Sequence, residues 1–109
     1  MAYDEGLADR IRDAFDGETG VVEKRMFGGL AFLVDGHMTI AANSKGEAMV
    51  HLDPDVAEEL VGPHVTHTVM RGRALRGWLD LDPEATASDT ELAQWVRRTV
   101  EYARSLPPK

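Results

Sequence analysis

Apolar residues recur at helical spacing near both ends of the chain, and between these segments they form short runs or alternate with polar residues. Residues 3–16 predict an amphipathic helix, because apolar side chains three or four positions apart fall on one helix face. That face holds Tyr3, Leu7, Ile11, Ala14 and Phe15. A second helix is predicted after Asp82 and Pro83, where Ser88 and Glu91 form a capping-box pattern. Its apolar stripe holds Leu92, Trp95, Val96, Thr99, Ala103 and Leu106, and two prolines at 107 and 108 predict its end.

The middle of the chain predicts strands. Four short runs that favour strands occupy residues 21–27, 30–34, 37–42 and 47–52. Asp35 and Gly36 separate the second run from the third, and Asp-Gly is a strong signal for a two-residue hairpin turn. Residues 43–46 are polar and predict a further turn. The four runs therefore predict an antiparallel meander.

A short helix is predicted after the meander. Asp53 provides a helix cap and Pro54 suits the first helical position. Gly62 and Pro63 predict its end. Residues 63–77 are rich in His, Arg and Gly and predict irregular backbone, and residues 78–81 predict a last strand.

This order of elements predicts an α+β domain, in which the N- and C-terminal helices pack on one face of an antiparallel sheet meander. The other face of the sheet then has to be solvated or covered by a partner. We therefore expect room for a homodimer on that face.

Composition narrows the class of protein. The chain has 109 residues, which predicts one domain spanning residues 1–109. It has no cysteine, so disulfides and thiolate metal sites are excluded. No apolar run approaches the length of a membrane span, and no signal peptide pattern precedes the first helix, so a cytoplasmic protein without membrane contact is expected. The net charge of −7 argues against direct nucleic-acid binding, because phosphate backbones repel an acidic chain.

Two local patterns carry candidate chemistry. His64 and His67 have H-x-x-H spacing, which suits metal chelation if further ligands join them. The Gly28–Gly29 doublet offers backbone amides to an anion, although it matches no nucleotide-binding motif and also suits a bulge or a close backbone crossing. The serines lie outside any G-x-S-x-G elbow, and Asp80 and Asp82 alternate with leucines as on an exposed strand face. We therefore predict no catalytic residues and no cofactor.

The basic residues cluster late in the chain. Residues 1–62 hold 13 acidic and 5 basic residues, whereas residues 63–109 hold 6 and 7. Arg71, Arg73 and Arg76 lie within six residues and precede Trp78. Arginine binds carboxylates and phosphates in a bidentate manner, and an indole ring offers a stacking face. Three interpretations stay open: ion pairs with the acidic short helix, contact with a partner protein, or contact with a nucleotide or nucleic acid.

One sequence block resembles a known family. The run Lys24-Arg25-Met26-Phe27-Gly28-Gly29-Leu30-Ala31-Phe32 is similar to the K-x-M-F-G-G-x-x-F pattern of the TfoX/Sxy N-terminal domain family. A second block, Gly72-Arg73 followed by Gly77-Trp78, and the ending Ala103-Arg104-Ser105-Leu106-Pro107 also resemble that family. The resemblance implies an α+β interaction module without established catalytic residues. Members of the family named for competence act as transcriptional coactivators with the cyclic-AMP receptor protein, and many have a second, helical domain. The resemblance implies a related regulatory role. Because the sequence shows only the first of these domains, we expect a single-domain member.

We therefore predict a non-enzymatic interaction module, an accessory protein of transcription or competence regulation that acts through protein contacts with a partner such as a transcription factor. The predicted contact residues are Arg25, Arg73, Arg76 and Trp78. Arg25 belongs to this group if its strand neighbours the arginine-rich segment. The alternative is a small-molecule or metal-binding protein that uses the Gly28–Gly29 region and His64 and His67.

Overall fold

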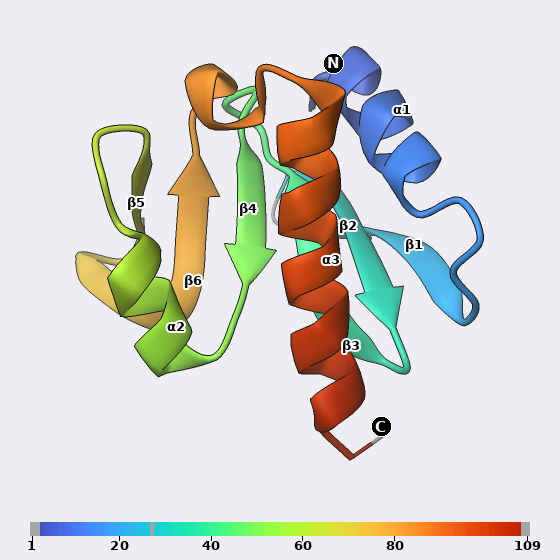
Figure 1. The fold of residues 1–109 in the computed structure, drawn as a ribbon. Helices are drawn as coiled ribbons and strands as arrows, with labels where there is room; N and C mark the ends of the chain where they lie inside the picture. The colour runs from blue at the N-terminus through green and yellow to red at the C-terminus, as the bar shows by residue number, and fades with distance from the viewer. Residues whose placement is uncertain (1–2, 27, 108–109) are drawn as a thin grey trace.

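The chain forms one six-stranded sheet with a layer of helices on one side (Figure 1). The structure, a computed structural model, describes residues 3–26 and 28–107. The strands are β1 (Val21–Met26), β2 (Gly29–Val34), β3 (His37–Ala42), β4 (Ala48–His51), β5 (Val65–Met70) and β6 (Arg73–Leu81). The helices are α1 (Glu5–Ala14), α2 (Pro54–Leu60), the 3₁₀ helix η1 (Pro83–Thr86) and α3 (Asp89–Ser105). The strand order is β1-β2-β3-β4-β6-β5, and neighbouring strands are antiparallel.

The predicted α+β class and the meander are confirmed. Strands β1 to β4 follow one another across the sheet, within one or two residues of the predicted bounds. The end of the first predicted strand, at residue 27, lies outside the described residues. Asp35 and Gly36 both have positive φ angles, 54° and 84°. A two-residue hairpin turn needs positive φ at both positions to match the twist of the strands that it joins.

The prediction of irregular backbone over residues 63–77 is wrong. This segment forms β5, a tight turn and the first half of β6, so the predicted strand at 78–81 is only the end of a nine-residue strand. The turn consists of Arg71 and Gly72, whose φ angles are 54° and 76°. Arginine is uncommon at such an angle, so the sequence carries a weaker turn signal here than Asp-Gly does.

Local signals set the ends of the helices as the sequence predicts. Asp53 accepts from the amides of Asp55 and Val56 at the start of α2, with Pro54 in its first turn. Ser88 and Glu91 form the predicted capping box of α3. The first helix begins two residues later than predicted, because the carboxylate of Asp4 caps it by accepting from the amide of Leu7 at 3.1 Å.

All the α-helices lie on the same face of the sheet, where α3 runs over β2, β3 and β4 and α2 packs on β6 (Figure 1). The main core lies between the two layers, and its most deeply buried large side chains include Ile11, Phe32, Ile40, Leu52, Leu79, Leu81 and Leu92. The prediction that the terminal helices pack on one face is confirmed.

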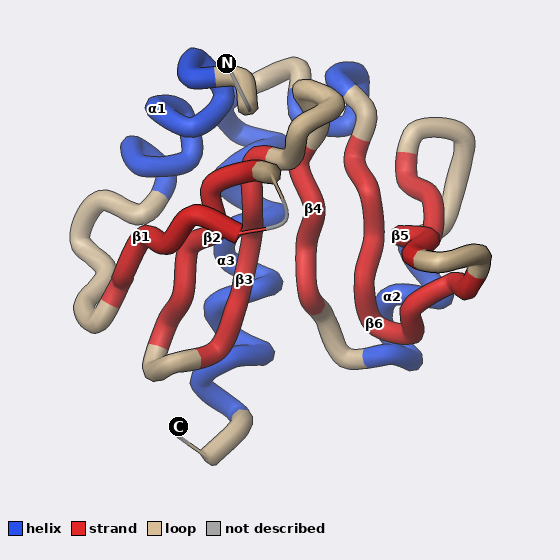
Figure 2. The backbone as a smooth tube through the Cα atoms, turned by 180° about the vertical axis from the view of Figure 1, so that it is seen from behind, coloured by secondary structure: helices blue, strands red, loops and turns tan. Residues whose placement is uncertain are grey.

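No helix within the described residues covers the opposite face, which Figure 2 shows from behind. A second apolar cluster lies there, with Ala31, Ala41 and Met49 at its centre. Met26, Leu33, Met38 and Trp78 pack against these three residues and stay partly exposed. We call this surface the bare face.

Candidate functional site

The arginines of the β5–β6 hairpin form an exposed basic group. Arg71, Arg73 and Arg76 are all exposed: Arg71 lies in the turn, Arg73 begins β6, and Arg76 lies further along that strand. The nearest carboxylate to Arg76 is that of Asp55 on α2, with 3.8 Å between Nη2 and Oδ1. The side chains are 76% and 94% exposed, so water screens this contact and it contributes little stability. The intramolecular interpretation therefore accounts for one arginine, and only weakly.

Trp78 lies at the base of this hairpin and is already in contact with another ring. Its ring stacks on His51 with 4.2 Å between centroids and 13° between planes. His51 in turn meets the edge of Tyr102 at 5.3 Å. Gly77 permits this path of β6, because it has a φ of 85° and a Cβ there would lie 2.7 Å from the carbonyl oxygen of Leu52. Trp78 is therefore a half-buried anchor of the hairpin.

Arg25 lies on a different part of the molecule. It belongs to β1, one edge strand of the sheet, and three strands separate β1 from β6. Arg25 lines an open hollow of about 270 Å³ together with Tyr3, Met26, Gly28 and Gly29. The strand of Arg25 therefore does not neighbour the arginine-rich segment, and Arg25 does not belong to the same surface as the hairpin arginines.

The glycine doublet has a structural explanation. Gly28 has a φ of 74°, a left-handed conformation that glycine adopts at low cost. A Cβ on Gly29 would overlap the carbonyl oxygen of Ala42 and lie 3.0 Å from the Cα of Asn43. The doublet therefore provides the turn and the close crossing of β2 over the end of β3.

The two predicted metal-ligating histidines do not converge. His64 Nδ1 lies 2.8 Å from Asp82 Oδ2, whereas His67 Nε2 lies 3.3 Å from Glu58 Oε1 on α2. Within residues 3–26 and 28–107, no group of three or more His, Asp or Glu side chains is arranged to hold a metal ion.

The ion pair of His64 predicts a measurable titration. The hydrogen bond to Asp82 raises the pKa of His64 above 6.5, and the same bond lowers the pKa of Asp82 below 3.8. The histidine's contribution to stability is thus lost as pH rises through its raised pKa, and the aspartate's is lost as pH falls through its lowered pKa. We expect Asp82→Asn to return the pKa of His64 towards 6.5 in an NMR titration. Glu84→Gln removes a weaker, purely coulombic influence and should lower that pKa less.

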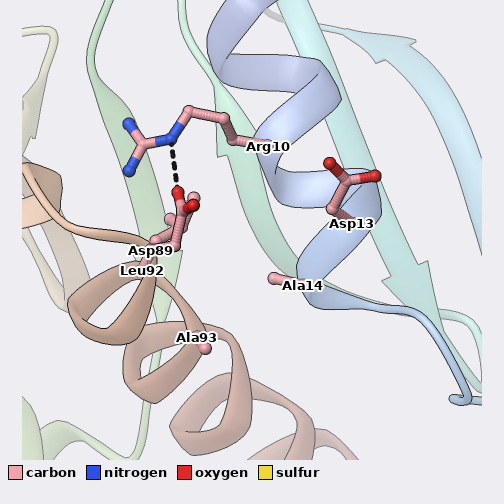
Figure 3. Close-up of a pocket in the computed structure, with 6 residues that line it drawn as sticks. All are labelled: Arg10, Asp13, Ala14, Asp89, Leu92 and Ala93. Atoms are coloured by element: carbon pink, nitrogen blue, oxygen red, sulfur yellow. Dashed lines mark hydrogen bonds and ion pairs between the residues drawn. The ribbon is translucent and has the colours of Figure 1, made fainter.

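A further hollow, of about 240 Å³, lies between α1 and α3 (Figure 3). Arg10 reaches across it, where Nε donates to Asp89 at 3.0 Å and Nη2 donates to the carbonyl oxygen of Thr86 at 2.7 Å. Sequence spacing offers no signal for a pair that is 79 residues apart. Because two of its nitrogens donate to the segment around the start of α3, Arg10 fastens α1 to that segment.

Membrane insertion through a helix has no support in the described part of the chain. Not one of its helices combines the length and the apolar character that a bilayer crossing demands.

The sheet order and the single helical layer define a small α+β domain with an exposed arginine hairpin and a sheet face that no described helix covers. The family model of the TfoX N-terminal domain matches residues 13–103, which is most of the chain, so the chain belongs to the TfoX N-terminal domain family. This is not a known enzyme family. A comparison with curated proteins gives no match. The matched region contains Arg25, Arg73, Arg76 and Trp78.

Proposed function

We propose that this protein is a regulatory binding module that captures an acidic partner protein through Arg73 and Arg76 of the β5–β6 hairpin. The observation that carries the proposal is the exposure of both side chains on β6 in a chain whose net charge is −7. Arginine forks suit carboxylates, so the surface fits a partner with clustered Asp and Glu side chains.

The use of the other arginines supports this assignment. Arg10, Arg12 and Arg104 form ion pairs with carboxylates of the same chain at 2.6–3.0 Å. Arg98 lies over the ring of Trp95, 4.7 Å from its centroid. The hairpin arginines have no comparable internal contact among the described residues, so their hydrogen-bonding capacity is left for a partner.

The family resemblance supports one kind of partner. The resemblance to proteins that act as transcriptional coactivators favours a transcription regulator as the acidic partner. Trp78 contributes by holding the base of the hairpin, because its ring stacks on His51.

The double variant Arg73→Glu, Arg76→Glu tests the proposal. We expect it to lose a protein that the wild type captures specifically from a lysate of the host, because like charges then face each other across the contact. Quantitative mass spectrometry of the captured proteins measures the loss, which should be about tenfold or more.

The matched control is Arg25→Glu, Arg97→Glu, which makes the same change in net charge at exposed sites on β1 and α3. Capture should survive this control. Equal loss in both variants would show a general charge effect and contradict the assignment to the hairpin.

Small-molecule binding is the second candidate function. One observation favours it. Arg25, Gly28 and Gly29 line the same hollow, so a ligand there would meet a guanidinium group and glycine backbone together. A ligand whose binding survives the hairpin variant and disappears with Arg25→Glu would support this alternative.

A further inference from the structure

The bare face carries one row of side chains that crosses five strands. Strand register pairs Lys24 with Ala31, Ala31 with Ala41, Ala41 with Met49, and Met49 with Asp80. Directly paired residues point to the same side of a sheet, so these five residues share the bare face. We call them the central row. It has a positive end on β1, a negative end on β6 and apolar residues between them.

The charges at the two ends are available for an external contact. Lys24 is exposed and forms no ion pair with any described residue. Asp80 is half-buried and accepts from the hydroxyl of Thr68 at Oδ1, 2.8 Å away, which leaves acceptor capacity on the carboxylate. The two residues are four strand spacings apart, or about 19 Å, so they do not neutralise each other within one copy.

We propose that the bare face binds the bare face of a second copy of this chain, about a two-fold axis that runs parallel to the strands through Ala41. Lys24 and Asp80 lie two strands away from Ala41 in opposite directions. The rotation therefore places Lys24 of each copy opposite Asp80 of the other. A two-fold interface repeats each contact, so it contains two such pairs.

The apolar part of the contact comes from the side chains around the middle of the central row. Ala31, Ala41 and Met49 are themselves only 0%, 4% and 5% exposed, because the partly exposed Met26, Leu33, Met38 and Trp78 pack against them. The next row contains Val22, Leu33 and Met38, with Trp78 at its far end. The same rotation brings Val22, which is 60% exposed, over Trp78. Burial of such side chains supplies the apolar part of the contact.

The face is small compared with the interfaces of stable dimers. Five strands about 4.8 Å apart and about 20 Å long give roughly 400 Å² in projection on each copy. Specific interfaces commonly bury about 800 Å² of accessible surface per partner. We therefore expect a reversible dimer that forms as concentration rises.

A charge exchange tests the pairing. Lys24→Glu places two Glu–Asp pairs in the homodimer, and Asp80→Lys places two Lys–Lys pairs there, so each variant alone should dimerise about tenfold more weakly or worse. An equimolar mixture of the two variants restores both opposite-charge pairs in the heterodimer. Sedimentation equilibrium of the full chain, from low micromolar to near-millimolar concentration, measures each association.

Arg25→Glu is the control, because it lies beside Lys24 on the same strand but pairs with Leu30 of the main core and so points to the helical side. It should leave dimerisation unchanged. A wild type that stays monomeric over the whole range, a dimer that ignores Lys24→Glu, or a mixture no stronger than the single variants would each overturn the proposal.

A second measurement needs no variant, in case Asp80→Lys disturbs folding. A carbodiimide joins a lysine directly to a carboxylate only when the two groups touch. In a mixture of isotopically light and heavy wild-type chains, a Lys24–Asp80 cross-link between copies should contain one light and one heavy peptide. Its absence in a sample that sedimentation shows to be dimeric would contradict this register.

Discussion

Replacing Gly29 with alanine should destabilise the fold by about 3 kcal/mol or more, because the new methyl group has no space. Its Cβ would overlap the carbonyl oxygen of Ala42 and also lie 3.1 Å from the carbonyl carbon of that residue. These are backbone atoms of the neighbouring strand, so they cannot yield by a rotamer change. Relief requires β2 and β3 to separate where they begin to pair, and urea unfolding followed by circular dichroism would measure the loss.

Gly62→Ala is the matched control for this substitution. A Cβ at Gly62 meets nothing within 4 Å among the described residues, and its φ lies outside the left-handed region. We expect a change within about 0.5 kcal/mol. If Gly29→Ala were as mild as this control, the close crossing of β2 and β3 would be wrong.

Replacing Phe32 with alanine should destabilise the protein by about 3–5 kcal/mol, since it removes a large side chain from a packed core. Phe32 is 1% exposed and stacks on Phe15, with 5.5 Å between ring centroids. Phe15 ends α1, so the lost contact also loosens that helix. A domain of this size has about 5–15 kcal/mol of stability in total, so the substitution removes a large share of it.

Hydrogen exchange distinguishes this effect from a general loss of stability. In Phe32→Ala the amides of α1 should exchange faster relative to those of β6, because α1 loses its packing partner on β2. Val69→Ala, at a side chain that is 59% exposed, should leave both the unfolding free energy and the α1 exchange rates nearly unchanged. Uniform acceleration of exchange would contradict the local coupling.

Much of this fold follows from local signals in the sequence. Asp35-Gly36, the cap at Asp53 and the box of Ser88 and Glu91 each act within a few residues, so their patterns predict structure reliably. The hairpin of β5 and β6 has no such local signal. Its turn uses Arg71 at positive φ, and a register shift between His67 and Val69 interrupts the alternation of buried and exposed residues along the strand.

The candidate sites were harder to predict because they depend on strand order. The sequence identifies Arg25 and Arg73 as exposed bases but does not reveal that β6 pairs with β4, which separates them by three strands. The central row is equally hidden, since it needs the registers of four strand pairs at once. The pair of Arg10 and Asp89 joins segments that share no local pattern.

The position of α3 has a consequence for synthesis. This helix covers β2, β3 and β4, yet it follows all of them along the chain. A nascent chain therefore emerges from the ribosome with the apolar surface of Phe32 and Ile40 uncovered until the last helix is made. The meander can pair locally before that point, but its core closes only after α3 leaves the exit tunnel. The sheet is thus exposed to chaperones, or to other nascent chains, for most of its translation.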